Sequence, residues 1–430
     1  MKSRAYRAVK FKNVNWETFL ESGERQRVTL GLDVSKDTIF AVWRWENGVC
    51  ERPWTIRNPW EVQLFAEKVG HLALVHGLQI AMEPTGTYGD ALRQALADLG
   101  IVLHWVSPKA AHDYAEVLDG VPSQHDGKDA AIVAELAALG KAKVWEWSSN
   151  EWEEELAGPV DWMEIHREQL TMWCGRLEGL LARHWPEASA ASKLTGGVLL
   201  RCLAEYGGPD GLAEDPKAAQ RLSRWSRGRW PKEKIEAFLN GARQSVGVRL
   251  SRVSRDQIRQ YAAKAQDCRR AIAHSRKALK GLAAGHEVLA RQAQAVGLVT
   301  ACVLWTRLGD PRSYDSGPAY RKAMGLNLKE RSSGRWIGRL KITKRGPSSV
   351  RRWLYFAALR LIRQGSAKRY YETRKTRGGE AALMRAIIGV MRKLALALYR
   401  VSVSDETFHI EKLFPGSTDK LPLDAAWDVA

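Results

Sequence analysis

The sequence has little cysteine and no long apolar run. Its five cysteines are scattered and never form a C-x-x-C pair, which argues against a disulfide framework and a zinc knuckle. No apolar run approaches the roughly 20 residues that a membrane helix needs. The first nineteen residues also lack the apolar segment of a secretory signal. We therefore expect a cytoplasmic protein with no membrane partner.

Positive charge is what the chain has in excess. Its 430 residues include 67 Lys and Arg against 48 Asp and Glu, a formal net charge of +19. Apolar residues make up 45% of the chain, enough for a large core, and the length predicts two or three domains. The excess charge favours a polyanionic partner, most often nucleic acid, although an anionic membrane surface or simple solubility would also explain it.

The charge is divided unevenly along the chain. Residues 27–145 hold 11 Lys and Arg against 15 Asp and Glu, whereas residues 291–400 hold 25 against 5. An acidic module joined to a basic one suits an enzyme that holds metal ions in one part and grips phosphates with the other. A basic surface that only aids solubility is the alternative.

The acidic module alternates strand and helix patterns. Its first two runs and the run after the hairpin signal Asn47-Gly48 predict three antiparallel strands. The order βββαβαβα predicts an α/β ribonuclease H-like domain with a mixed sheet. The predicted strands are 28–34, 38–45, 49–56, 78–83 and 101–106, and the predicted helices begin near residue 58 and span 88–99 and 108–118.

The remainder of the chain has helical patterns. Residues 252–282 are polar and lack Pro, which predicts one long exposed helix or an antiparallel pair, with a regular coiled coil left open. Residues 295–310 predict one apolar helix in which Gly297 and Thr300 allow close packing. The predicted divisions are an N-terminal extension (1–26), the ribonuclease H-like domain (27–145), a helical or coiled-coil spacer (146–290), a mainly α C-terminal domain (291–403) and a tail (404–430).

Four carboxylates lie at the ends of predicted elements in the acidic module. Asp33 ends the first strand and Glu83 ends a later buried strand, while Asp126 and Asp129 open a helix, on one face of it. Carboxylates at adjacent strand ends and on a neighbouring helix can converge on a pair of Mg²⁺ ions that assist phosphoryl transfer. The alternative is that Asp126 caps the helix, Asp129 favours its dipole and the other two are solvated.

Two further side chains flank the start of that helix. His125 and Lys128 are candidates for contacting a phosphate, but only their position in the sequence suggests it.

A hydroxyl lies among cations in the basic module. Ser332 and Ser333 form a polar turn with Gly334, and a new helix is predicted from about Pro347. Positive charge there would stabilise an attacking alkoxide and the transition state of a phosphoryl transfer. An ordinary turn and purely phosphate-gripping cations are the alternatives. The candidate nucleic-acid-binding cations are Arg331, Arg335, Lys341, Lys344, Arg345, Arg351 and Arg352.

An ordered set of motifs resembles one family. GLDVSKDT, AMEPTGTYGDAL and SQHDGKDA in the acidic module, with LGDPRSYDSGPAYRKAMGL, RSSG and KITKRGPSSVRRWL in the basic one, are similar to the Piv-type DEDD transposases of bacterial insertion sequences. That family comprises serine-dependent recombinases guided by a bridge RNA. The resemblance covers roughly residues 27–400, and it implies that the ribonuclease H-like domain is RuvC-like and that the C-terminal domain is a transposase domain with a nucleophilic serine.

The resemblance implies a complete reaction. The tetrad would be Asp33, Glu83, Asp126 and Asp129, and the nucleophile Ser332, with Ser333 the neighbouring possibility. The implied function is an RNA-guided DNA recombinase that cuts and rejoins strands through a phosphoserine intermediate with Mg²⁺. Its partners would be donor and target DNA, a non-coding bridge RNA and further copies of the chain, in a homodimer or homotetramer, at the bacterial nucleoid.

Three features depart from the usual family pattern. They are the N-terminal extension, Arg335 where a second glycine is common, and the Arg/Trp-rich stretch 221–234. Two other functions stay open. One is a metal-dependent junction-resolving nuclease, but the serine motif in a basic module counts against it. The other is a non-catalytic nucleic-acid-binding scaffold, but the intact tetrad counts against it.

Overall fold

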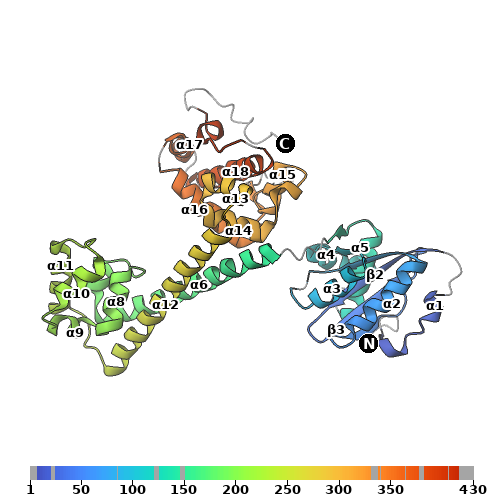
Figure 1. Ribbon diagram of the computed structural model, residues 1–430, viewed down its shortest axis with the longest axis horizontal. Helices are drawn as coiled ribbons and strands as arrows, with labels where there is room; N and C mark the ends of the chain where they lie inside the picture. The colour runs from blue at the N-terminus through green and yellow to red at the C-terminus, as the bar shows by residue number, and fades with distance from the viewer. Residues whose placement is uncertain are drawn as a thin grey trace. The chain divides into compact units, whose positions relative to one another are not determined.

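Two units make up the chain, Met1–Ser149 and Asn150–Ala430. The ribbon of the computed structural model shows an α/β first unit and a helical second unit (Figure 1). The residues that the structure describes are 7–20, 25–84, 86–120, 125–145, 151–330, 338, 340–363, 365–376, 382–404 and 406–415.

A seven-stranded mixed sheet forms the centre of the first unit, in the order β1-β4-β3-β2-β5-β6-β7. The antiparallel trio predicted from sequence is β2, β3 and β4, and β5 and β6 extend the sheet in parallel from β2. The predicted order of elements is confirmed, and β1 and β7 add edges that the sequence did not predict. The strands are β1 (Val9–Lys10), β2 (Arg27–Val34), β3 (Thr38–Arg44), β4 (Trp54–Arg57), β5 (Gly77–Met82), β6 (Leu103–Trp105) and β7 (Lys143–Val144).

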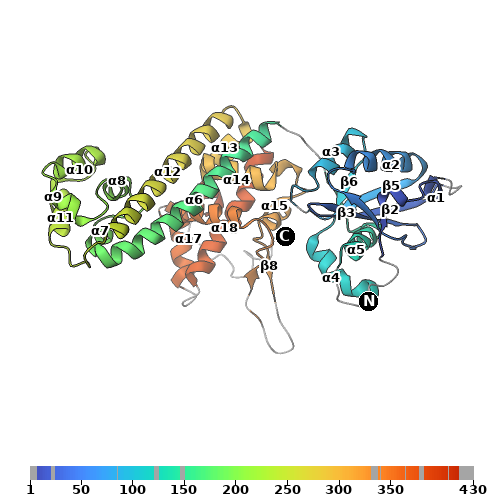
Figure 2. The same ribbon diagram turned by 90° about the horizontal axis from the view of Figure 1, so that it is seen from below.

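Helices cover both faces of this sheet (Figure 2). On β2 and β5, residues such as Leu30 and Met82 share a hydrophobic cluster with α2 and α3. Their alternate neighbours face the other side, where Ala81 packs in a cluster with α4 and α5. The helices are α1 (Glu17–Leu20), α2 (Val62–Val75), α3 (Asp90–Asp98), α4 (Pro108–Asp119) and α5 (Asp126–Ala138), and a short 3₁₀ helix spans Phe11–Asn13.

The described part of the N-terminal extension packs into the first unit. Its strand β1 pairs in parallel with β4. Phe11 and Phe19 are buried in the same cluster as the sheet, and the backbone oxygen of Phe19 lies 2.7 Å from Nε2 of the buried His76. Burial of these aromatic rings explains why the segment is ordered against the sheet.

A pair of long helices organises the second unit. Helix α12 (Arg252–Leu282) has the bounds that the sequence predicted for a single helix, and it packs along α6 (Glu151–His184). The two run antiparallel, since Trp152 Nε1 at the start of α6 donates to the backbone oxygen of Leu282, 2.8 Å away. The far end carries a helical cap made of α7 (Pro186–Ala191), α8 (Gly197–Tyr206), α9 (Pro209–Glu214), α10 (Ala218–Ser226) and α11 (Lys232–Arg243).

The other end of the pair joins a C-terminal helical bundle. The apolar helix predicted for 295–310 is wrong, because Gly297, at φ +80°, ends one helix and begins the next after a bend of 120°. Within the described part of the chain no single helix is long and apolar enough to cross a membrane, although α13 and α14 pass that test as a bent pair. The bundle contains α13 (Glu287–Val296), α14 (Leu298–Leu308), a 3₁₀ helix (Pro311–Ser313), α15 (Gly317–Ala323), the strands β8 (Leu328–Lys329) and β9 (Lys341–Ile342), α16 (Ser348–Leu361), α17 (Gly365–Thr376), α18 (Ala382–Val403) and α19 (Ile410–Leu413).

Candidate catalytic site and nucleic-acid interface

Asp33 and Glu83 occupy equivalent positions at the ends of two neighbouring parallel strands. Leu32 of β2 is in register with Met82 of β5, and the residues that follow them in the sequence are Asp33 and Glu83. Side chains alternate along a strand, which places both acids on the sheet face that α5 covers. With neighbouring strands about 4.8 Å apart, the two carboxylates lie side by side.

Helix α5 approaches this face so closely because of a glycine. A Cβ atom added to Gly31 would lie 2.2 Å from the backbone oxygen of Ala130 and 2.4 Å from the backbone nitrogen of Ala134. This contact holds the first turn of α5, which contains Asp126 and Asp129, beside the carboxyl end of β2. Sequence reasoning missed Gly31, although a glycine inside an apolar strand is a known sign of close backbone approach.

Burial and neighbouring negative charges raise the pKa of Asp33, Glu83 and Asp129. Burial, followed by the charges of Asp129, Asp126 and Glu83, raises the pKa of Asp33 to about 7. Burial and the charge of Asp129 raise the pKa of Glu83. Burial also raises the pKa of Asp129, with Asp126 acting in the same direction. The predicted residues are thus brought together into one electrostatically coupled cluster.

His125 and Lys128, the two candidates for contacting a phosphate, have structural roles at the start of α5. His125 is the N-cap of α5, and its Nδ1 accepts from the backbone N–H of Lys128 at 3.2 Å, so the cap is this histidine and not Asp126. Lys128 is fully buried and therefore does not reach a phosphate at the surface. The charges of both His125 and Lys128 counteract the rise in the pKa of Asp129.

The donor set fits a hard divalent cation. All four side chains offer carboxylate oxygens, the ligands that Mg²⁺ prefers, and burial followed by the charges of the other three acids raises the pKa of Asp33. No three His, Cys, Asp or Glu side chains among the described residues are grouped so that they could hold a metal ion as they stand.

The predicted serine turn falls in a part of the chain that the structure does not describe. Ser332, Ser333, Arg331 and Arg335 all lie outside the described residues. On either side of them, β8 and β9 pair antiparallel, with Leu328 opposite Ile342.

Three of the predicted cations lie in β9 or just after it. Lys341, Lys344 and Arg345 are exposed, and none makes an ion pair with another described residue. The turn that carries them is held firmly, since the backbone nitrogens of Thr343 and Lys344 donate to the oxygens of Asn327 and Gly325. The side chains of these three cations are therefore open to solvent.

The two predicted arginines of α16 are engaged inside the protein. Arg351 Nη1 donates to the backbone oxygen of Gly346 at 2.7 Å, which holds the preceding turn. Arg352 Nη2 lies 2.9 Å from Glu164 of α6. Sequence reasoning did not anticipate these intramolecular partners, because Glu164 is 188 residues away in the chain.

Glu164 of α6 connects the α6–α12 helix pair to the C-terminal bundle, and the sequence analysis did not predict this role. Its carboxylate accepts from Arg307 Nη2 at 2.8 Å and from Trp353 Nε1 at 3.2 Å, in addition to its pair with Arg352. Burial alone would raise the pKa of Glu164, but the bonds from Arg307 and Trp353 lower it.

Comparison with known protein families gives a match in the bundle. Residues 288–372 match the transposase family IS116/IS110/IS902. The matched stretch contains the serine turn and the exposed cations that follow it, and it supports an insertion-sequence transposase with DNA as its substrate. A search of curated proteins found no match to the chain.

Proposed function

We propose that this transposase acts as an RNA-guided, site-specific DNA recombinase. The coupled carboxylate cluster on the first unit carries the proposal, in a chain whose basic bundle matches a transposase family. The RuvC-like assignment of the first unit, suggested by its motifs, agrees with its mixed sheet.

Asp33, Glu83, Asp126 and Asp129 are the proposed ligands of Mg²⁺. When bound, Mg²⁺ supplies stabilisation of the charge on the attacking and leaving oxygens of a phosphoryl transfer. The chain contributes the orientation of the carboxylates through the β2–β5 register and the seat of α5 on Gly31. Without the metal, burial and the charges of the other acids raise the pKa of Asp33 to about 7.

Ser332 is the proposed nucleophile, with Ser333 the neighbouring possibility. The serine oxygen forms a bond to phosphorus while the bond from phosphorus to one sugar oxygen breaks, and the hydroxyl proton passes to a base. The resulting ester keeps the energy of the phosphodiester, so that rejoining needs no external energy source. The exposed Lys341, Lys344 and Arg345 would hold the phosphate backbone.

The proposed partners follow from the family resemblance. They are donor DNA, target DNA, a bridge RNA that pairs with both, and further copies of the chain in a homodimer or homotetramer. The excess of positive charge supports several polyanionic partners, because every neutralised phosphate releases counterions.

A covalent adduct tests the nucleophile. The enzyme is incubated with its RNA, Mg²⁺ and end-labelled DNA, then denatured, and the labelled protein is mapped by peptide mass. We expect the adduct on Ser332. Ser332→Ala should lose both adduct and recombination, whereas Ser333→Ala, the matched control, should be milder.

Two outcomes would contradict the proposal. Cleaved ends that form without an adduct, and persist in Ser332→Ala, would favour the junction-resolving nuclease. Binding of one DNA sequence by the RNA-free protein, roughly a thousandfold tighter than random DNA, would contradict RNA guidance, because that ratio is typical of proteins that read bases themselves.

A further inference from the structure

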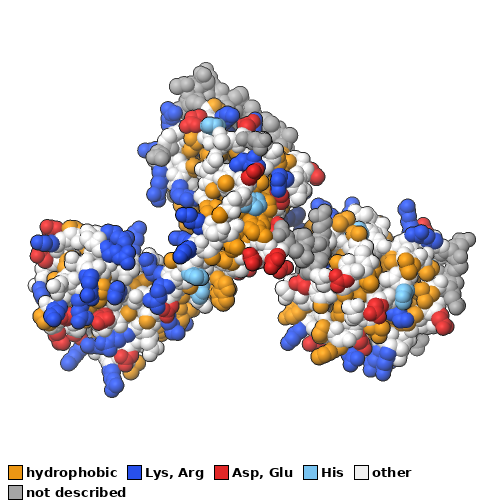
Figure 3. Space-filling view, viewed as in Figure 1, with side chains coloured by type: hydrophobic (Ala, Val, Ile, Leu, Met, Phe, Trp, Pro, Cys, Tyr) orange, Lys and Arg blue, Asp and Glu red, His pale blue; other side chains and the backbone are white. Residues whose placement is uncertain are grey.

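The helical cap carries a dense group of cations on one turn. We call residues 224–234 the cap turn; they comprise the end of α10, the connection and the start of α11. The cap turn contains five Lys and Arg residues and a single acid, Glu233. Arg224, Arg227, Arg229 and Lys232 are exposed and Lys234 is partly exposed. Lys and Arg side chains gather over the cap in the space-filling view (Figure 3).

Two cations next to the cap turn are neutralised by acids. Arg221 lies 3.0 Å from Glu205 and 3.3 Å from Asp215, and Arg255 lies 2.9 Å from Asp210. None of the five cations of the cap turn makes an ion pair with a described residue. The positive charge of the cap turn is therefore not offset by an acid of the described chain.

The backbone of the cap turn places a cation where glycine is favoured. Arg227 has φ +54°, in the left-handed region, and the only other described residue besides glycine with a positive φ is Lys344, at +57°. A side chain in this conformation costs stability, and such residues cluster at functional sites. Both positions hold exposed cations, and Lys344 belongs to the proposed phosphate grip of the bundle.

Two aromatic rings pack beside the C-terminal end of the cap turn. Lys234 lies over the ring of Trp230, 4.7 Å from its centroid, and Trp230 packs edge-on against Phe238 at 5.4 Å. The ring contact restrains the Lys234 side chain, which lowers the entropy that this side chain loses on binding.

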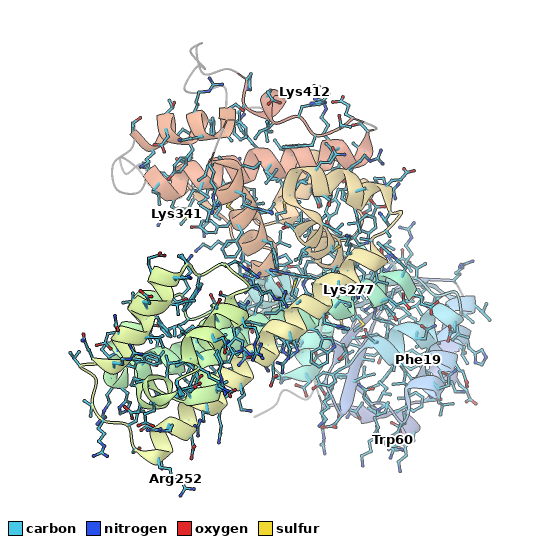
Figure 4. All side chains as sticks on the ribbon, turned by 60° about the vertical axis from the view of Figure 1, so that its left-hand side comes forward. Phe19, Trp60, Arg252, Lys277, Lys341 and Lys412 are labelled. Carbon is cyan, nitrogen blue, oxygen red and sulfur yellow. The ribbon has the colours of Figure 1, made fainter. Side chains whose placement is uncertain are left out.

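The cap and the bundle pack against different parts of α12. Ile258 of α12 belongs to the hydrophobic cluster of the cap, whereas Leu279 belongs to the cluster of the bundle. Figure 4 labels Arg252 at the start of α12 and Lys277 towards its other end. The cap turn and the exposed cations of the bundle therefore belong to separate parts of the second unit.

We propose that the cap turn binds the phosphate backbone of double-stranded DNA that flanks the site of strand exchange. This inference rests on the proposed function, which makes DNA the substrate of the bundle. The contact would be to phosphates alone and would add affinity without reading bases.

Salt dependence of binding tests the cap turn in the full chain. The test variant is Arg224→Ala, Arg227→Gly and Arg229→Ala combined. The matched control, Arg276→Ala, Lys277→Ala and Lys280→Ala, removes three exposed cations near the other end of α12. The probes are a 30-base-pair DNA duplex of arbitrary sequence and the RNA duplex of the same sequence, each titrated at several salt concentrations.

We expect the test variant to bind the DNA duplex at least tenfold more weakly in roughly 0.1 M salt. Its slope of log affinity against log salt should fall by about 2 to 3, since each lost phosphate contact contributes about 0.9. The control should keep the wild-type slope. An unchanged slope in the test variant, or a loss confined to the RNA duplex, would overturn the inference.

A single substitution separates binding from folding. Arg227→Gly should raise the melting temperature, because glycine accepts the positive φ, and should still weaken DNA binding severalfold. Higher stability with unchanged affinity would overturn the role of Arg227. The adduct assay on Ser332 remains a separate test of the proposed function, because these variants keep the serine and the four carboxylates.

Discussion

Replacing Asp33 by Asn should stabilise the metal-free protein at neutral and alkaline pH. The ionised carboxylate is half-buried and faces three other acids, so its charge opposes folding. Asn has nearly the same shape but carries no charge. The substitution should therefore remove a repulsion while it leaves the packing of β2 and α5 intact.

The size of the effect follows from the pKa of Asp33. Folding raises this pKa from 3.8 to about 7, and each pKa unit corresponds to 1.36 kcal/mol, so the full shift would be worth about 4 kcal/mol. The side chain keeps partial contact with solvent, which screens the charge. We expect roughly 2 kcal/mol in the local free energy of unfolding at pH 8.

The pH dependence has a definite sign. Below pH 3.8 the carboxyl is protonated in both the folded and unfolded states, and the substitution changes little. Between pH 3.8 and about 7 the unfolded state loses its proton first, so the free energy of unfolding falls as the pH rises. Above pH 7 the loss is complete, and the advantage of Asp33→Asn is largest.

Hydrogen exchange of the full chain measures this locally. With chelator present, and after correction for intrinsic rates, peptides covering β2 should exchange roughly 30-fold more slowly in Asp33→Asn than in wild type at pH 8, and only about threefold at pH 5. Added Mg²⁺ should slow exchange in the wild type and much less in the variant, since a bound cation offsets the same repulsion.

A nearby acid provides the matched control. Asp37 is exposed just beyond the end of β2, and Asp37→Asn should change protection by less than about 0.5 kcal/mol at either pH. Faster exchange in Asp33→Asn at pH 8, or a difference that does not depend on pH, would refute the electrostatic account of the cluster.

Three further substitutions test the described packing by thermal unfolding. Gly31→Ala should lower the free energy of unfolding by about 3 kcal/mol and abolish recombination, because the new Cβ meets the backbone of α5. Gly70→Ala, whose new Cβ meets only side-chain atoms, should be tolerated. Equal effects of the two substitutions would contradict this reasoning. Glu164→Ala should lower the free energy of unfolding by about 2 kcal/mol. This loss should become smaller in acid, because folding lowers the pKa of Glu164. A loss that does not depend on pH would contradict this role of Glu164. Lys344→Gly should gain about 1 kcal/mol, since φ is positive there, and any loss would argue against strain.

Local patterns were sufficient where neighbouring residues decide the structure. The stretch 252–282 has no Pro and is rich in helix-forming residues, and it is one helix over that range. The apolar stretch around Gly297 shows the limit of such patterns. Helical spacing continues through the glycine, but packing of α13 and α14 on the bundle turns the chain by 120° there.

The sequence by itself determined the order of strands and helices, the acidic and basic modules, and the position of each carboxylate at an element end. These properties depend on periodicity and composition within short windows. The tertiary structure alone decided that α5 lies against Gly31, that the pKa of Asp33 rises to about 7, and that Lys128 is buried. It also decided that Arg352 pairs with Glu164 while the cap turn keeps its charge, because burial and charge pairing depend on residues that are far apart in the chain.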